Sequence, residues 1–153
     1  MAISLKTAGT WARMVTDNGT VAIPGTPAAG DRMFLWGTWK TFSITVVDPS
    51  GWTRVTDFAD GAIAAGNGTG SVKVACWYRD WQSGDGDPAI DYSAAPTEGH
   101  WVIQAWQKAA AEAWDAPTFV TAAVTAVDPW SATSSATITI KSGAVVFELI
   151  GLR

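Results

Sequence analysis

Apolar and polar residues alternate with a period of two along much of the chain, which is typical of β-strands that bury one face. In the clearest segment, 71–81, Val72, Val74 and Cys76 alternate with Lys73, Ala75 and Trp77. Turn-forming Gly, Pro, Asn and Asp separate such segments. The pattern predicts strands over 10–15, 33–40, 43–47, 52–58, 71–81, 89–93, 101–107, 119–127, 136–140 and 144–152.

These strands predict an all-β fold, because no helix of crossover length alternates with them. We expect an antiparallel β-sandwich, jelly-roll-like, with eight or more short strands. The length of 153 residues suits a single domain over 1–153, with a short N-terminal arm over about 1–9. The Ala-rich stretch 108–114 favours at most one short helix. Asp48-Pro49-Ser50-Gly51 predicts a hairpin-like turn between its flanking strands.

The segment 33–40 is apolar on both faces, since Leu35 and Trp39 alternate with Phe34 and Trp36. A strand of this kind is covered by protein on both sides. We therefore expect Trp36 in the core. We expect the same of Cys76, which lies in an apolar run and behaves there as a small hydrophobic residue.

Composition narrows the classes of function. Hydrophobic residues make up 48% and charged residues 16% of the chain, and the net charge is −4. This charge argues against duplex nucleic acid and anionic membranes as partners, because both select clustered Lys and Arg. The apolar runs fall far short of the ~20 residues that span a bilayer. Ten tryptophans indicate large packing or contact surfaces.

The residues that usually carry catalysis or metal binding are scarce. His100 is the only histidine and Cys76 the only cysteine, so a closed zinc site within one subunit is excluded. No Gly-x-Ser-x-Gly motif accompanies His100. Four carboxylates gather around one Gly-rich turn: Asp80, Asp85, Asp87 and Asp91. Carboxylates in such a turn could bind calcium, but their order is not that of an EF-hand loop. Turn formation is therefore the simpler interpretation of these aspartates. We expect no enzyme and no cofactor.

Several stretches have the character of one known type of domain. They are Gly30-Asp31 before the apolar strand 32–39, Pro49-Ser50-Gly51-Trp52-Thr53, Trp77-Tyr78-Arg79, Ala136-Thr137-Ile138-Thr139-Ile140 and Gly143-Ala144-Val145-Val146. Together they resemble a β-sandwich found in virion proteins of tailed phages and prophages, from Gly30 to the C-terminus. The resemblance implies that Trp52 lies in the core and that none of these positions is catalytic. Many such proteins continue past the last of these strands, whereas this sequence stops at Arg153. We therefore expect a small dedicated virion component.

We therefore expect a virion structural protein that acts by protein–protein contact, as a capsid decoration or cement protein or as a head- or tail-associated accessory. Its partners would be other virion proteins and copies of itself. Trp11, after the N-terminal arm, and Trp130, in the turn Asp128-Pro129-Trp130-Ser131, are the interface candidates, although both could instead cap the core.

The alternative is a carbohydrate-binding module for host glycans. The second face of 71–81 combines aromatic and cationic side chains, which either pack across the sheet through cation–π contacts or, if exposed, stack on sugar rings. In the second case the stacking platform would be Trp77, Trp81 and Trp101. Exposure of these three side chains decides between the two interpretations.

Overall fold

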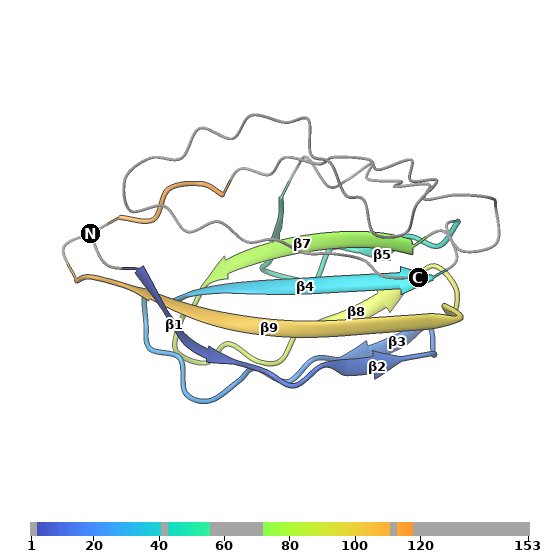
Figure 1. Ribbon diagram of the computed structural model, residues 1–153, viewed down its shortest axis with the longest axis horizontal. Coiled ribbons are helices and arrows are strands. Elements are labelled where there is room, and N and C mark those ends of the chain that lie inside the picture. Colours follow the sequence, from blue (N-terminus) through green and yellow to red (C-terminus); the bar gives the residue numbers. More distant parts are fainter. Residues whose placement is uncertain (1–2, 41–42, 56–71, 111–112, 118–153) are drawn as a thin grey trace, which may run out of the picture.

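The computed structural model describes residues 3–40, 43–55, 72–110 and 113–117. These residues form nine strands in two antiparallel sheets and contain no helix (Figure 1). The predicted all-β class and antiparallel sandwich are confirmed, whereas the jelly-roll topology stays a prediction. In the described part of 108–114 there is no helix, and the strand Glu98–Lys108 instead runs into the start of this stretch. Within the same ranges, no helix is long and apolar enough to cross a membrane.

The large sheet has six strands in the order β1-β9-β4-β7-β6, and β2 also pairs with β9. The bounds are β1 Ile3–Ala8, β2 Ala12–Met14, β4 Arg32–Lys40, β6 Thr53–Arg54, β7 Val72–Asp80 and β9 Glu98–Lys108. The central strand β4 pairs along its full length with both β7 and β9, so that Gly37, for example, lies opposite Ala75 on one side and Trp101 on the other.

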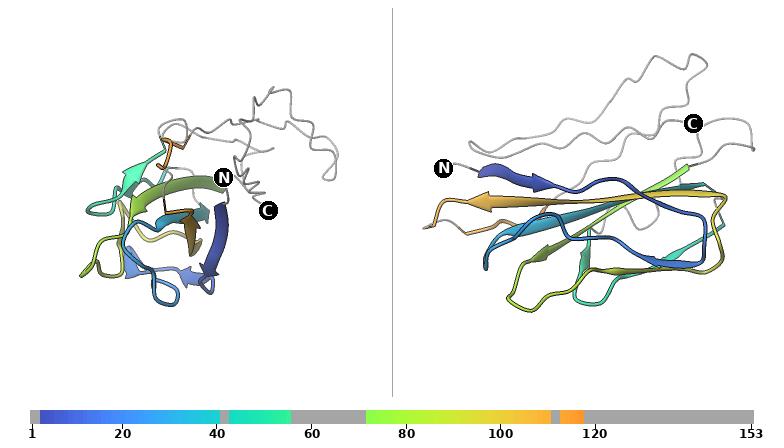
Figure 2. Two further views of the ribbon diagram at one scale, coloured as in Figure 1. Left: turned by 90° about the vertical axis from the view of Figure 1, so that its left-hand side faces the viewer. Right: turned by 90° about the horizontal axis from the view of Figure 1, so that it is seen from below.

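The small sheet has the order β3-β8-β5, with bounds β3 Asn18–Thr20, β5 Val46–Val47 and β8 Ala89–Tyr92. It packs on one face of the large sheet, because the Tyr92 ring of β8 meets the rings of Trp39 and Trp101 edge-on, at centroid distances of 6.1 and 6.0 Å. Figure 2 shows the strands end-on at the left, with β1 (dark blue) along the outside of the group.

Both faces of β4 are buried, as its sequence predicts. Leu35 and Trp39 face the small sheet, while Phe34 and Trp36 on the other face are also buried. The expected core residues are confirmed, since Trp36, Trp52 and Cys76 are all buried. Burial raises the pKa of the Cys76 thiol well above its usual range, so the sulfur behaves as an apolar group.

Four aromatic rings form a tryptophan cluster between the sheets: Trp39, Trp77, Trp101 and Tyr92. Trp101 is stacked on Trp39 at 5.9 Å and tilted against Trp77 at 5.5 Å. Two glycines leave room for it. A Cβ at Gly37 would overlap the six-membered ring of Trp101, and one at Gly99 would lie 2.5 Å from the Tyr92 hydroxyl. Glycine at these two positions is what lets the rings lie against the strand backbones.

Two sequence expectations differ from the structure. Residues 3–8, expected to belong to a short N-terminal arm, form the strand β1 and pair with β9. The turn at 48–51 does not close a hairpin, because β5 before it belongs to the small sheet and β6 after it to the large one. The turn itself is present: Trp52 N donates to Pro49 O at 3.0 Å and Gly51 adopts a φ of 78°. Its role is to pass the chain from one sheet to the other.

Candidate functional site

One border of the large sheet, beside β9, is formed by two short strands that follow one another along β9. Both β1 and β2 pair with β9, β1 with its C-terminal part and β2 with its N-terminal part, and Gly9 to Trp11 connect them. Gly9 N donates to Ile103 O at 2.8 Å, so the connection stays close to β9. Among the described residues, no strand pairs with the outer side of β1 or β2. We call residues 3–15 the β1–β2 edge.

This edge exposes three large apolar side chains: Leu5, Trp11 and Val15, which are 46%, 50% and 43% exposed. The other exposed large apolar side chain among the described residues is Val47, at 60%, on the small sheet. The alternation of β1 and β2 places Leu5 on the same side as Trp106 of β9, and Val15 on the side of Arg13 and opposite to that of Met14. Trp11 thus lies exposed on a border that no described strand covers, a placement that suits a contact residue.

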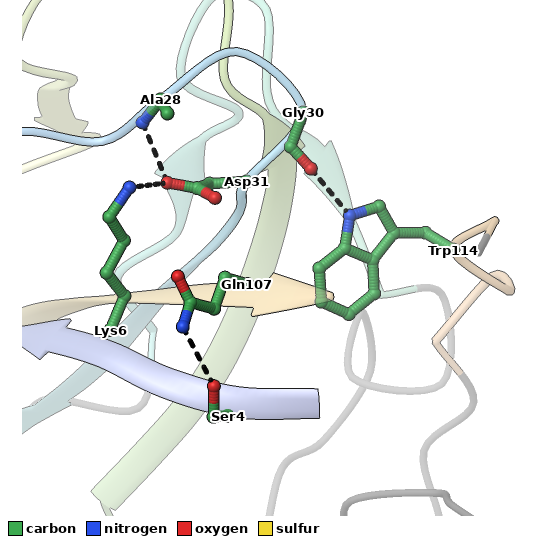
Figure 3. A network of polar contacts seen from close by, with 7 residues as sticks. All are labelled: Ser4, Lys6, Ala28, Gly30, Asp31, Gln107 and Trp114. Atoms are coloured by element: carbon green, nitrogen blue, oxygen red, sulfur yellow. Dashed lines mark hydrogen bonds and ion pairs between the residues drawn. The ribbon is translucent and has the colours of Figure 1, made fainter. Parts of the chain in front are cut away.

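The charged groups at the edge are paired within the chain. Lys6 Nζ lies 2.6 Å from Oδ2 of Asp31, a buried carboxylate that also accepts a hydrogen bond from Ala28 N at 2.7 Å (Figure 3). In the same view, Gln107 Nε2 donates to Ser4 Oγ at 3.1 Å and fixes β1 to β9. The edge therefore presents little free charge to a partner.

A second ion pair joins β2 to β9. Arg13 Nε and Nη2 donate to the two oxygens of Glu98 at 2.5 and 2.9 Å, in bidentate geometry. His100 Nε2 lies 3.0 Å from Glu98 Oε1. The hydrogen bond and the positive charge of Arg13, with a contribution from the neighbouring His100, lower the pKa of Glu98 below its ordinary value. The same hydrogen bond raises the pKa of Arg13.

The structure contradicts the predicted sugar-stacking platform. Trp77 and Trp101 are both 0% exposed, and Trp81 is partly buried against the core. Trp77 Nε1 donates to Asp48 Oδ1 at 2.7 Å, and Trp101 Nε1 donates to the Tyr92 hydroxyl at 2.5 Å. Burial between the sheets raises the pKa of Tyr92 to about 12, so the hydroxyl stays protonated. The prediction is wrong because alternation shows which residues share a face but not that another sheet covers it.

The alternative expectation for that face, cation–π packing, is met with a different arginine. The guanidinium of Arg54 lies 5.0 Å from the Trp77 ring centroid, and its Nε is 2.5 Å from Asp48 Oδ1. Asp48 therefore accepts hydrogen bonds from both Arg54 and Trp77 and joins the turn at 48–51 to the large sheet.

The carboxylates around the Gly-rich turn do not converge. Asp80 pairs with Arg32, Asp85 with Arg79, and Asp87 accepts a hydrogen bond from Ile23 N at 2.8 Å. Within the described ranges, no three His, Cys, Asp or Glu side chains come together in a way that could hold a metal ion. These aspartates hold loops and strands in place. Trp130, the other predicted interface residue, lies outside the described residues.

Leu5 and Val15 were not among the contact residues expected from the sequence. A signal was present, because Ile3 and Leu5 alternate with Ser4 and Lys6, but four such residues are too short a run to predict a strand. Comparison of the chain with protein-family models, with curated proteins and with solved structures gave no match.

Proposed function

We propose that this chain is a non-enzymatic structural protein of a phage particle, either a capsid decoration or cement protein or a head- or tail-associated accessory. It acts by protein–protein contact, with other virion proteins and copies of itself as partners and the virion as its location. The resemblance of residues 30–153 to phage and prophage β-sandwiches supports this proposal, and so do the exposed apolar side chains of the β1–β2 edge, which suit protein–protein contact.

The exposure of Trp11 carries the proposal. In contrast to the tryptophans between the sheets, its side chain is half exposed, and Leu5 and Val15 expose further apolar surface on the same edge. Tryptophan is enriched at the energetic centres of protein interfaces, because its large surface and its N–H contribute together. An exposed tryptophan on a sheet border that none of the described strands covers therefore fits a docking residue better than a core residue.

The use of charged residues is consistent with a structural role. Arg32 is buried, its Nε lies 2.6 Å from Asp80 Oδ1, and its guanidinium lies 4.8 Å from the Tyr78 ring centroid and 5.0 Å from that of Trp114. Its Nη1 also donates to Asp115 O at 2.5 Å. These contacts fix the segment after β9 to the start of β4. Like Asp31 and Asp48, Arg32 is engaged in holding separate segments together.

The test is quantitative mass spectrometry of purified phage particles from the source, in which this chain is counted against the major capsid protein. A fixed ratio near one copy per capsid subunit supports capsid decoration, and a handful of copies per particle supports a head- or tail-associated accessory. Absence of the chain from intact particles overturns the proposal. Particles stripped of loosely bound protein by a salt wash serve as the control for carry-over.

A further inference from the structure

The chain contains two asparagines, Asn18 and Asn67, and each is followed by glycine. In an Asn-Gly pair the asparagine side chain is open to attack by the next backbone nitrogen, because glycine has no Cβ to hinder the approach. Asn67 lies outside the described residues. Asn18 lies in β3 and is exposed to water. A chemically reactive pair is therefore built into a short strand of the small sheet.

Packing accounts for the glycine of this pair. A Cβ at Gly19 would lie 3.1 Å from the sulfur of Met14 and 3.2 Å from its terminal methyl group. Met14 is a buried residue of β2, so a side chain at position 19 would have to push it aside. Glycine thus has a structural role here that is separate from the reactivity it gives to Asn18.

The ladder between β3 and β8 holds the nitrogen that would attack. Tyr92 N donates to Asp17 O at 2.7 Å. Hydrogen-bonded pairs recur at every second residue of an antiparallel ladder, so Gly19 and Ile90, which lie opposite one another, also form such a pair. A backbone amide held in this way is not free to lose its proton and turn toward the Asn18 side chain. The reaction therefore requires β3 to leave β8 first.

The strand β3 is suited to such opening. It has three residues and, among the described strands, pairs only with β8. The central strand β4, by contrast, pairs over nine residues with a neighbour on each side. Segments with few contacts open locally at a small cost in free energy, far below that of global unfolding. Opening of β3 is thus the step that should control the chemistry at Asn18.

We propose that Asn18 is a site of spontaneous deamidation, that opening of β3 sets its rate, and that the product loosens β3. In the open strand the Gly19 nitrogen loses its proton to solvent and attacks the side-chain carbonyl carbon of Asn18. A C–N bond forms, and the side-chain nitrogen leaves as ammonia. Water then opens the cyclic imide at one of its two carbonyls, which gives aspartate or isoaspartate. The reaction needs only water and is independent of the proposed function.

The product places like charges opposite one another. Asn18 lies opposite Asp91 in a non-hydrogen-bonded pair, the kind in which facing side chains are closest. Asn18 Nδ2 also donates to Asp17 Oδ1 at 3.1 Å, and an ionised carboxylate has no proton to donate. Like charges directly opposite destabilise a sheet. Aspartate at position 18 therefore weakens the pairing of β3 with β8, and isoaspartate, which lengthens the backbone, disturbs its register as well.

The first test uses the Asn67→Gln chain, in which Asn18 is the only asparagine. It is incubated at mildly alkaline pH, either folded in buffer or unfolded in urea. Ion-exchange chromatography counts the acidic species, and mass spectrometry of peptides locates the change. We expect conversion at Asn18 in both samples, about tenfold or more slowly in the folded chain. Asn18→Gln in the same background is the control and should give almost no acidic species.

Two results of this test overturn the proposal. If Asn18 stays intact in the folded chain on prolonged incubation while the unfolded chain converts, the folded protein has no such site. If the folded and unfolded chains convert at the same rate, β3 does not control the reaction.

The second test isolates the effect of the charge. Asn18→Asp should melt below Asn18→Gln at neutral pH, and added salt should narrow the difference because it screens exposed charges. Asp91→Asn removes the facing carboxylate, so in this background the two substitutions at position 18 should melt more nearly alike. Equal melting of Asn18→Asp and Asn18→Gln in the otherwise unmodified chain contradicts the loosening of β3. Neither test depends on whether the chain is found in phage particles.

Discussion

Trp101 and Trp11 lie almost side by side in the large sheet, because Ala12, the residue after Trp11, is opposite Trp101 on β9. Trp101 is completely buried and its N–H is bonded to Tyr92, whereas Trp11 is half exposed. The difference comes from the neighbours. Gly37 opens a space beside Trp101 and the small sheet closes over it, while Trp11 sits on a border with no described strand beyond it. Whether a tryptophan is buried or exposed here depends on the space that its neighbours leave and on the sheet that covers it.

Trp101→Ala, at the buried position, should reduce the free energy of unfolding more than any other substitution considered below. It removes the ring that touches Trp39, Trp77 and Tyr92 and leaves a cavity between the sheets. We expect the free energy of unfolding to fall by about 3–5 kcal/mol, as for other buried aromatic residues replaced by alanine. Urea unfolding followed by circular dichroism measures it. A loss below about 1 kcal/mol would mean that the cluster does not hold the sheets together.

Gly37→Ala tests whether the space beside Trp101 is required. The added Cβ overlaps the Trp101 ring, so ring or strand must shift, at a cost of about 1–3 kcal/mol in unfolding free energy. Gly86→Ala is the matched control, because a Cβ there meets nothing within 4 Å. Thermal unfolding of the two variants should separate them clearly. If Gly37→Ala unfolds at the same temperature as the control, the Trp101 ring adopts another position without loss of stability, and glycine is not required at position 37.

Glu98→Gln should have a smaller, pH-dependent effect. Because Arg13 lowers the folded-state pKa of Glu98, ionised Glu98 contributes stability above its unfolded-state pKa, and this contribution is lost as the pH falls through the folded-state pKa. The unmodified chain should therefore melt slightly above Glu98→Gln at neutral pH, and the difference should vanish in acid. Melting curves across this range test it. A difference that grows in acid would contradict the assigned sign.

Trp11→Ala should change stability least, within about 0.5 kcal/mol, because half of the side chain is already in water. Its effect belongs to binding: we expect the affinity for the particle to fall about tenfold or more. Urea unfolding measures the stability, and a pelleting assay with particles depleted of this chain measures the affinity. A large loss of stability would place Trp11 with the core residues instead.

The sequence predicted the central strands well because their patterns are long. The apolar faces of 33–40 and the alternation of 71–81 correspond to β4 and β7, and Trp36 and Cys76 lie in the core as expected. Short elements were harder to predict. Asn18-Gly19, a strong turn signal, lies in β3, where it pairs with β8, since tertiary pairing outweighs local preference in a strand of three residues.

The candidate site was predicted only in part, for a related reason. Trp11 could be proposed because it stands apart from the longer patterns, but its neighbours on the edge, Leu5 and Val15, gain meaning only once β1 and β2 pair with β9. The burial of Trp77 depends on the position of the small sheet. Which sheet covers which face is a property of long-range packing, and no local pattern contains it.

The tryptophan cluster also makes the sandwich optically distinctive. The rings of Trp39 and Trp101 are nearly parallel, with an interplanar angle of 5° and centroids 5.9 Å apart, and Trp77 lies close to them. Indole transitions held so near one another couple, and a fixed asymmetric arrangement of this kind gives rise to strong circular dichroism in the ultraviolet. That signal arises only while the two sheets are closed over the rings, so this circular dichroism reports directly whether the core is packed.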